Sequence, residues 1–211
     1  MVLYKRFSTT GPQKIVTVLT VVAETVHKCS LNILPAKTTL LILLVGALTA
    51  CTGIPEGVEP VDDFALPRYL GKWYEIARLD HSFERGLSKV TAEYSLRDDG
   101  GVRVINRGYS SAKGEWEQAE GKAYFVGDPD VGHLKVSFFG PFYGSYVIFE
   151  LDDDYRYSMI SGPDRSYLWL LSRTPEVDDA LKQRFVKKAR ALGFDADALI
   201  FVDQTPDSRG R

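Results

Sequence analysis

Residues 89–173 form a series of short segments in which apolar and polar side chains alternate, and tight turns separate the segments. In the first of them, 89–96, the apolar face consists of Val90, Ala92, Tyr94 and Leu96. Alternation with a period of two is typical of a strand with one buried face, because successive side chains point to opposite sides of a sheet. Asp-Gly and Gly-Pro pairs in the turns favour hairpins. The pattern therefore predicts antiparallel β-structure.

Eight strands are expected. The first opens with Gly71, and the others cover residues 89–96, 102–109, 115–126, 133–139, 145–152, 152–161 and 166–173. Hairpins between neighbours make an up-and-down meander, and closing such a sheet into a barrel removes its two exposed edges. The predicted fold class is all-β, an eight-stranded antiparallel up-and-down β-barrel, which has room for side chains or for one small apolar ligand.

One helix is expected after the last strand, over residues 174–194, with Thr174 as N-cap and Pro175 in the first turn. Gly193 suits the position just beyond a helix, where a positive φ is common. An apolar stripe predicts that the helix packs on the barrel wall. The residues of that stripe are Leu181, Phe185, Ala189 and Leu192. A final strand-like segment follows at 198–204.

A charge-free apolar run ends in Leu48-Thr49-Ala50-Cys51. The run is shorter than the roughly 20 residues of a spanning helix and fits the core of a secretory signal. A Leu three positions before a Cys, with small residues between, resembles the bacterial lipobox, in which the cysteine is acylated and the leader removed. Residues 1–50 are therefore predicted to be a signal peptide and Cys51 a lipidation site. The alternative is a buried helix with an incidental cysteine, but Pro55 and its glycine neighbours do not continue a helix.

The segments around this signal complete the predicted domain plan. A second apolar run at 15–26 makes the leader unusually long, which suggests the hypothesis that translation starts downstream of Met1. Residues 51–66 are rich in Pro, Gly and acids and are expected to be the lipidated cysteine and its tether. The folded domain is placed at 67–206 and a short tail at 207–211.

Composition argues against two classes of protein, disulfide-stabilised domains and nucleic-acid-binding proteins. Cys29 and Cys51 are the only cysteines, so no disulfide can stabilise the segment after the leader. The leader holds five of the 26 basic residues and one of the 28 acidic residues, which leaves the rest of the chain net acidic. A nucleic-acid partner is not expected, because such proteins present a basic face.

Two elements of the sequence resemble the lipocalin family. Gly71-Lys72-Trp73 matches the G-x-W that opens the first lipocalin strand, and Arg173 stands at the end of the last predicted strand, before the helix. The usual middle motif is matched only in part, by Asp153-Asp154-Tyr155. Over about 60–206 the chain is similar to bacterial lipocalins in six motifs that occur in the same order. These motifs are WYEIAR, FERGL, YSLRDDGG, EGKAYF, LKVSFFGPFYG and GPDR-x-YLW-x-LSRTP.

The resemblance implies a function. Bacterial lipocalins of this kind bind fatty acids or lysophospholipids, without a cofactor, and are anchored to the outer membrane. Thr52 after the cysteine implies the periplasmic face of that membrane, and the resemblance allows a homodimer. It further implies that Arg173 packs across Trp73 and that Trp169 and Tyr143 line the cavity.

Strand phase extends the list of candidate ligand contacts. If Arg173 reaches Trp73, the odd positions of its strand face inward. Similar phase arguments place Phe138 and Phe125 inward, and Tyr109 is added as a further aromatic candidate. The candidate ligand-binding residues are Trp169, Tyr143, Phe138, Tyr167, Phe125 and Tyr109.

An alternative is a lipocalin-fold enzyme acting on a lipid or isoprenoid, which would need ionisable groups in the barrel, such as Glu75. We do not expect an enzyme, because the domain has no cysteine beyond Cys51 and no G-x-S-x-G motif. His81 and His133 are expected at the surface or in caps. The run 152–154 lacks the spacing of a calcium loop, so no metal is expected. A solidly packed barrel and a haem-binding barrel are weaker alternatives.

Overall fold

The structure is a computed structural model that describes residues 52–205. The predictions for the signal peptide (1–50), for Cys51 and for the tail (207–211) lie outside this range. Within 52–205, no helix has both the length and the apolar character needed to cross a membrane.

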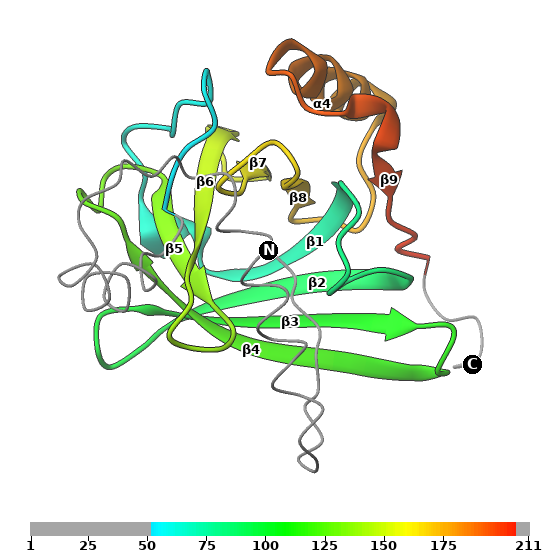
Figure 1. Cartoon of the computed structure of the whole chain (residues 1–211), viewed down its shortest axis with the longest axis horizontal. Coiled ribbons are helices and arrows are strands. Elements are labelled where there is room, and N and C mark those ends of the chain that lie inside the picture. The colour runs from blue at the N-terminus through cyan, green and yellow to red at the C-terminus, as the bar shows by residue number, and fades with distance from the viewer. Residues whose placement is uncertain (1–51, 206–211) are drawn as a thin grey trace, which may run out of the picture. The chain divides into compact units, whose positions relative to one another are not determined.

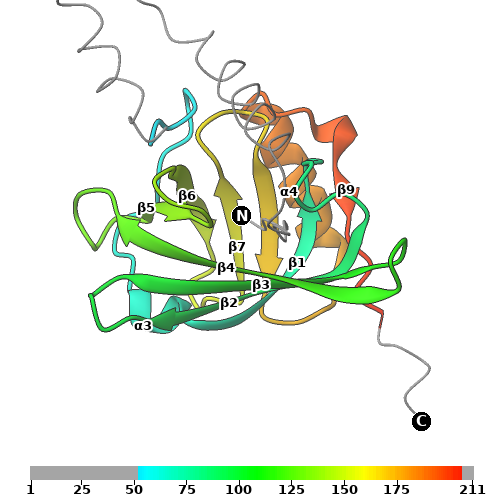
Figure 2. The same cartoon turned by 60° about the horizontal axis from the view of Figure 1, so that its bottom comes forward.

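The described chain folds as the predicted closed barrel of antiparallel strands (Figures 1 and 2). Strands β2 to β8 pair in sequence order, and β1 pairs with both β8 and β2, which closes the ring. The eight strands are β1 (Gly71–Arg78), β2 (Leu87–Leu96), β3 (Val102–Ser110), β4 (Glu115–Phe125), β5 (His133–Ser137), β6 (Gly144–Leu151), β7 (Tyr157–Ser161) and β8 (Leu168–Ser172).

Strand β7 is shorter than the alternation predicts, because residues 152–156 form a turn. The Asp152 carboxylate accepts hydrogen bonds from the backbone N–H groups of Asp154 and Arg156, at 3.1 Å each. Tyr155 has a positive φ of 60°. Such local side-chain bonds offer the backbone an alternative to the sheet ladder, so the extended start predicted for this strand is wrong.

Within the part of the chain that the structure describes, two α-helices flank the barrel strands. The short α3 (Leu66–Tyr69) precedes β1, and α4 (Asp179–Ala191) follows β8. The N-cap of α4 is Asp178, whose carboxylate accepts from the Leu181 N–H at 2.7 Å, and not the predicted Thr174. Gly193 follows the helix with φ of 79°, as expected.

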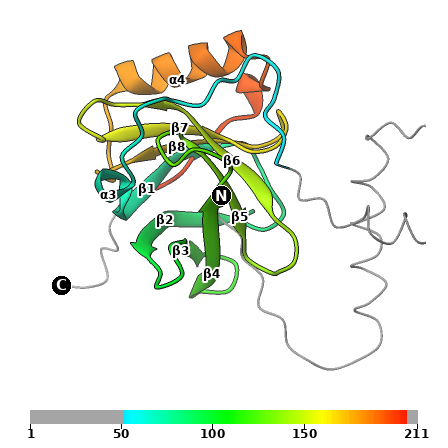
Figure 3. The ribbon, with the colours of Figure 1, turned by 90° about the vertical axis from the view of Figure 1, so that its left-hand side faces the viewer.

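Helix α4 lies on the outside of the barrel, over the side formed by β6, β7, β8 and β1 (Figures 1 and 3). Phe185 and Ala189 are fully buried beneath it, and Leu181 and Leu192 are partly buried, as the apolar stripe predicts. The wall residues beneath it include Ile76, Ala77, Val147, Phe149, Met159, Leu168 and Leu170. These strands are therefore apolar on both faces.

A second apolar cluster faces the barrel interior and takes side chains from all eight barrel strands. On β8, Trp169 and Leu171 point inward while Leu168 and Leu170 point outward to the helix side. The buried members are Phe64, Tyr69, Trp73, Ala92, Tyr94, Val102, Val104, Ala123, Leu134, Val136, Tyr146, Ile148, Tyr155, Ile160, Trp169 and Leu171. The inward phase predicted for β8 is thus confirmed.

The segment expected to be a tether packs against the barrel for most of its length. Val58 and Phe64 are buried. The Val61 N–H donates to the Ile148 carbonyl at 2.8 Å, and the Gly132 N–H donates to the Val61 carbonyl at 2.8 Å. The folded domain therefore extends well upstream of residue 67.

The C-terminal segment fills a split in the barrel wall. Strands β1 and β2 pair over Gly71–Tyr74 and then diverge. Beyond that point β9 (Ile200–Phe201) pairs with β1. The Gln204 side-chain amide donates to the carbonyls of Glu75 and Val90, at 2.8 and 2.9 Å. The predicted final strand is real but short, and it serves to join the two diverging strands.

Arg173 and Trp73 lock the end of the barrel that α3 covers. The guanidinium lies 3.9 Å from the centroid of the indole ring, as the family resemblance implies. Its nitrogens also donate to three backbone carbonyls, those of Lys72 at 2.9 Å, Arg68 at 2.7 Å and Tyr155 at 3.3 Å. One side chain therefore ties α3, β1 and the β6–β7 turn together.

We expect Arg173→Met to lower the free energy of unfolding by about 2–3 kcal/mol, because the cation–π contact and three hydrogen bonds are lost. Urea denaturation of the full chain would measure this. The control is Arg156→Met, whose solvent-exposed guanidinium pairs with Asp152 and should contribute little to stability. Equal losses in the two variants would contradict the structural role of Arg173.

Candidate functional site

The candidate site lies at the end of the barrel opposite α3, here called the open end. Connections β1–β2 (79–86), β3–β4 (111–114), β5–β6 (138–143) and β7–β8 (162–167) meet there, because β1 starts at the α3 end and the strands alternate in direction. Figure 3 shows α3 on one side of the molecule and the β5–β6 and β7–β8 connections on the other.

Four aromatic side chains, here called the mouth aromatics, stack at this end: His81, Phe83, Tyr167 and Trp169. The His81 ring lies 4.3 Å from Tyr167 and 5.0 Å from Phe83, with interplanar angles of 11° in both cases. Tyr167 lies 6.0 Å from Trp169. The β1–β2 connection and the start of β8 thus present a continuous aromatic surface to the interior.

Beneath this surface lies a buried ionic cluster of Glu75, Arg78 and Glu84, all at most 2% exposed. The Arg78 guanidinium donates to a Glu75 carboxylate oxygen at 2.7 Å and also to the backbone carbonyls of Glu84 and Leu87. The Trp169 indole N–H donates to the Glu84 carboxylate at 3.1 Å. The cluster therefore joins β1, the β1–β2 connection and β8.

The cluster holds two carboxyl groups for one guanidinium. Burial raises the pKa of Glu75, against the opposing effect of Arg78. Burial and, next, the charge of Glu75 raise the pKa of Glu84 well above its ordinary value. One oxygen of each carboxyl group has no hydrogen-bond partner. Because like charges do not both ionise in a buried site, one of the two acids keeps its proton at neutral pH.

Both histidines of the domain are buried, although we expected them at the surface or in caps. His81 is only 8% exposed within the aromatic stack, and burial lowers its pKa to about 4, so its imidazole is neutral at pH 7. His133 is also buried, with its Nε2 2.8 Å from the Ser145 hydroxyl. The sequence around a single histidine carries no signal that distinguishes a buried position, such as those of His81 and His133, from an exposed one.

Four of the six predicted ligand contacts face the interior. Trp169 is buried there, and Tyr167, Phe138 and Phe125 are partly buried against the interior cluster. Phe138 packs over Gly121, where an added Cβ would lie 2.9 Å from the Phe138 ring. The space that small residues leave on β4 is thus used, in part, by a neighbouring aromatic ring.

Tyr143 and Tyr109 face the outside of the barrel, so their inward placement is wrong. Tyr143 lies 6.4 Å from the Tyr124 ring and 5.4 Å from the Lys135 ammonium group, both on outward positions of β4 and β5. Tyr109 stacks against Trp116 at 5.7 Å, because Val102 and Val104 set the inward phase of β3 at even positions. Strand parity assigns Tyr109 to the outer wall, and the contacts of Tyr143 with Tyr124 and Lys135 assign it there too.

The opposite end of the interior carries a group of tyrosine hydroxyls. The Tyr146 hydroxyl lies 2.7 Å from that of Tyr69 and 2.9 Å from that of Tyr94. Burial raises the pKa of Tyr69 to about 12, so the phenol stays protonated at neutral pH. The interior is therefore mostly apolar along its wall, with Asn106 as a buried polar side chain on β3 and further polar groups near both ends.

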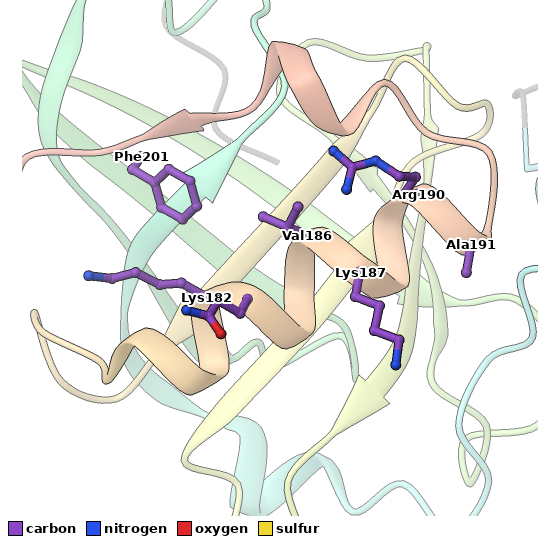
Figure 4. Close-up of a pocket in the computed structure, with 7 residues that line it drawn as sticks. Lys182, Val186, Lys187, Arg190, Ala191 and Phe201 are labelled. Atoms are coloured by element: carbon purple, nitrogen blue, oxygen red, sulfur yellow. The ribbon is translucent and has the colours of Figure 1, made fainter.

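The described residues form hollows on the outside of the barrel. One, of about 580 Å³, lies between α4 and β9 and is lined by Lys182, Val186, Lys187, Arg190 and Phe201 among others (Figure 4). Another, of about 750 Å³, lies on the outer face of β1–β4, beside Tyr74 and Trp116. Among residues 52–205, no three His, Cys, Asp or Glu side chains group as metal ligands.

Comparison with known proteins identifies the family. The model of the lipocalin-like domain matches residues 63–204. The chain belongs to the lipocalin family. Among its relatives, "Outer membrane lipoprotein Blc" of Vibrio cholerae is 62% identical over 78% of this chain and 96% of that protein. The protein of the same name in Escherichia coli K12 is 59% identical over 71% of this chain and 85% of that protein.

Solved structures support the lipocalin fold. Insecticyanin from the tobacco hornworm Manduca sexta is similar with a TM-score of 0.58 and 24% identity, over 72% of this chain and 87% of that chain. The cockroach allergen Per a 4 is similar with a TM-score of 0.57 and 21% identity, over 73% of this chain and 96% of that chain. At these identities the likeness concerns the fold.

The proton on the buried acid pair predicts a pH dependence of stability. Above pH 4.5, the ordinary pKa, Glu84 of the unfolded chain is ionised while the buried carboxyl group keeps its proton. The folded state then binds more protons, so its stability falls as pH rises towards the folded-state pKa. Glu84→Gln keeps an acceptor for Trp169 and removes this titration.

We therefore expect the unfolding free energy of Glu84→Gln, minus that of the unaltered protein, to rise with pH above 4.5, by up to about 1.4 kcal/mol per pH unit. Urea denaturation of both proteins from pH 4 to pH 9 measures this difference in unfolding free energy. His81 is present in both proteins, so its titration contributes equally to each and cancels in the difference. A difference that stays constant over this range would show that Glu84 ionises normally.

Proposed function

We propose that this lipocalin binds a fatty acid or a lysophospholipid inside its barrel. The observation that carries the proposal is the interior itself: a mostly apolar wall contributed by all eight strands, with the mouth aromatics stacked at one end. Burial of an acyl chain gains about 0.8 kcal/mol per methylene. A dozen methylenes would offset the cost of association and leave micromolar binding or better.

The proposed contacts are the inward-facing aromatic residues, with the acyl chain along the wall and the head group towards the mouth. Trp169, Tyr167, Phe138 and Phe125 remain candidates, and Phe83 and His81 join them because they stack on Tyr167. Tyr109 and Tyr143 are withdrawn as contacts because they lie on the outer wall.

We further propose that the protein acts in the cell envelope as a lipoprotein of the outer membrane, at its periplasmic face. The lipobox-like sequence before Cys51 and the printed name of the relatives at 58–62% identity support this location. Acyl groups on Cys51 would hold the barrel at the membrane that supplies its ligand. A homodimer stays a prediction.

Tyr167→Ala is expected to weaken lysophospholipid binding about tenfold, because about 1.4 kcal/mol of aromatic contact at the mouth is lost. The matched control is Tyr109→Ala, which removes the same side chain from the outer wall and should change the affinity less than twofold. Titration calorimetry on the mature protein measures both. Equal losses in the two variants would place the ligand outside the barrel.

A second candidate function is a lipocalin-fold enzyme acting on a lipid. The buried pair Glu75 and Glu84 favours it, since a carboxyl group with a raised pKa is the kind of group used in acid–base catalysis. If the protein only binds lipid, lysophospholipid incubated with it should be recovered intact, with no more released fatty acid than with Glu84→Gln. Faster release that is lost in Glu84→Gln would favour the enzyme.

A further inference from the structure

The described chain enters the domain at the open end of the barrel. Arg165, in the β7–β8 connection, donates to the Glu56 carbonyl at 2.7 Å and to the Leu192 carbonyl at 2.8 Å. A Cβ added to Gly53 would lie 3.9 Å from the Pro163 carbonyl. Residues 53–56 therefore lie against the β7–β8 connection. In Figure 3 the segment starts on the side of that connection and crosses the barrel to α3.

From Val58 onwards this segment is packed and hydrogen-bonded to the barrel, so it does not add to the flexible length between Cys51 and the domain. Val58 is buried, and its N–H donates to the Pro55 carbonyl at 3.0 Å. Further along, backbone hydrogen bonds join Val61 to β6 and the Phe64 N–H to the Asp130 carbonyl at 2.7 Å. The length of chain between Cys51 and the folded domain is therefore only a few residues.

Covalent geometry then limits how far Cys51 lies from the open end. A fully extended residue spans at most about 3.6 Å. Cys51 precedes Glu56 by five residues and Gly53 by two, so its Cα lies within about 18 Å of the Glu56 Cα and about 7 Å of the Gly53 Cα. Acyl chains on Cys51 would hold this end of the barrel, and not the α3 end, at the membrane surface.

The open end also carries exposed apolar side chains. Phe139 and Phe142 of the β5–β6 connection are 55% and 46% exposed, and Ile54, beside the start of the described chain, is 36% exposed. The connection 138–143 contains no charged residue. Aromatic side chains favour the interfacial layer of a membrane. This loop is therefore suited to apolar contact with lipid, with no basic group of its own to select anionic lipids.

We propose that the open end of the barrel faces the bilayer and that Phe139 and Phe142 insert into its interfacial layer. This inference rests on the proposed lipidation of Cys51, and the partner is a lipid surface. The mouth aromatics would then lie next to the leaflet, so that a lysophospholipid or fatty acid passes between bilayer and barrel without exposing its acyl chain to water. Because the contact is apolar, it should depend little on salt or on anionic lipid.

The test uses the acylated mature protein reconstituted in phosphatidylcholine vesicles, with a nitroxide label at one introduced cysteine. The domain has no cysteine after Cys51, whose sulfur the proposed acylation would block. Phe142→Cys carries the label at the open end. Leu96→Cys is the control, at an exposed apolar position (62% exposed, against 46% for Phe142) where β2 ends on the α3 side of the barrel. Paramagnetic relaxation by oxygen, which enriches in lipid, is compared with relaxation by a water-soluble nickel chelate.

We expect the ratio of oxygen to nickel accessibility to be severalfold higher at position 142 than at position 96. Adding Phe139→Ser should lower the ratio at position 142 while leaving lysophospholipid affinity unchanged. Equal ratios at the two positions, or a higher ratio at position 96, would overturn the proposal. Dipolar coupling between labels at position 142, abolished by unlabelled protein, would instead show that a second copy covers the loop, and would also overturn it.

The controls separate this proposal from those on which it rests. The mass of the protein before labelling shows whether Cys51 is acylated, so an unmodified cysteine counts against the anchor. Lysophospholipid affinity, measured by calorimetry on the same variants, tests ligand binding separately. A protein that binds lipid and is acylated, but keeps position 142 in water, would contradict only the orientation.

Discussion

Strand β1 is shared between the two ends of the sheet, and this double pairing is the constraint on which the other features depend. Its first half pairs with β2 and its second half with β8, so the ring closes around Tyr74. Closure defines an inside and an outside for every strand, and both are apolar on the side that α4 covers. The Arg173–Trp73 contact secures one end of this joint, and Gln204 bridges the strands where they separate.

A local irregularity in β1 creates the buried ionic cluster. The register with β8 shifts between Glu75 and Ala77, which marks a β-bulge. A bulge re-aims the side chains that follow it. Trp73 and Glu75 point inward by simple alternation, and after the bulge Arg78 does so as well, within reach of Glu75 and Glu84. The acids therefore lie under the mouth aromatics as a consequence of how β1 bends to serve both neighbours.

The two ends of the barrel consequently differ in chemistry. At the α3 end, tyrosine hydroxyls bond to one another and a guanidinium covers Trp73, which suits a closed floor. At the other end, stacked rings lie above carboxyl groups that each keep one unpartnered oxygen, and the exposed phenylalanines and the chain entry lie on the same side. Ligand entry, proposed anchoring and membrane contact would then all take place at one end.

Period-two alternation and hairpin turns predicted the strands and the barrel, apart from the start of β7, and helical spacing predicted the apolar stripe of α4. These features depend on local geometry and on the need to bury one face. Parity also predicted Trp169, Tyr167, Phe138 and Phe125 as inward-facing. The same parity argument would have excluded Tyr109 from the barrel interior. Val102 and Val104 are apolar residues at even positions of the same strand, so its odd positions, including 109, face outward. Arg78, Glu84 and His81 were missed because a bulge and a loop, which alternation does not describe, bring them together.

The sequence by itself thus determined the fold, the acidic surface and the lipobox-like position of Cys51. Only the tertiary structure decided that residues 55–64 pack on the barrel, that two carboxyl groups share one buried guanidinium, and that the chain enters beside the mouth. The physical reason is that all three depend on contacts between residues far apart in sequence, such as Arg165 with Glu56 and Trp169 with Glu84. Local patterns specify which face of a strand is buried, and the closed barrel specifies which neighbours meet there.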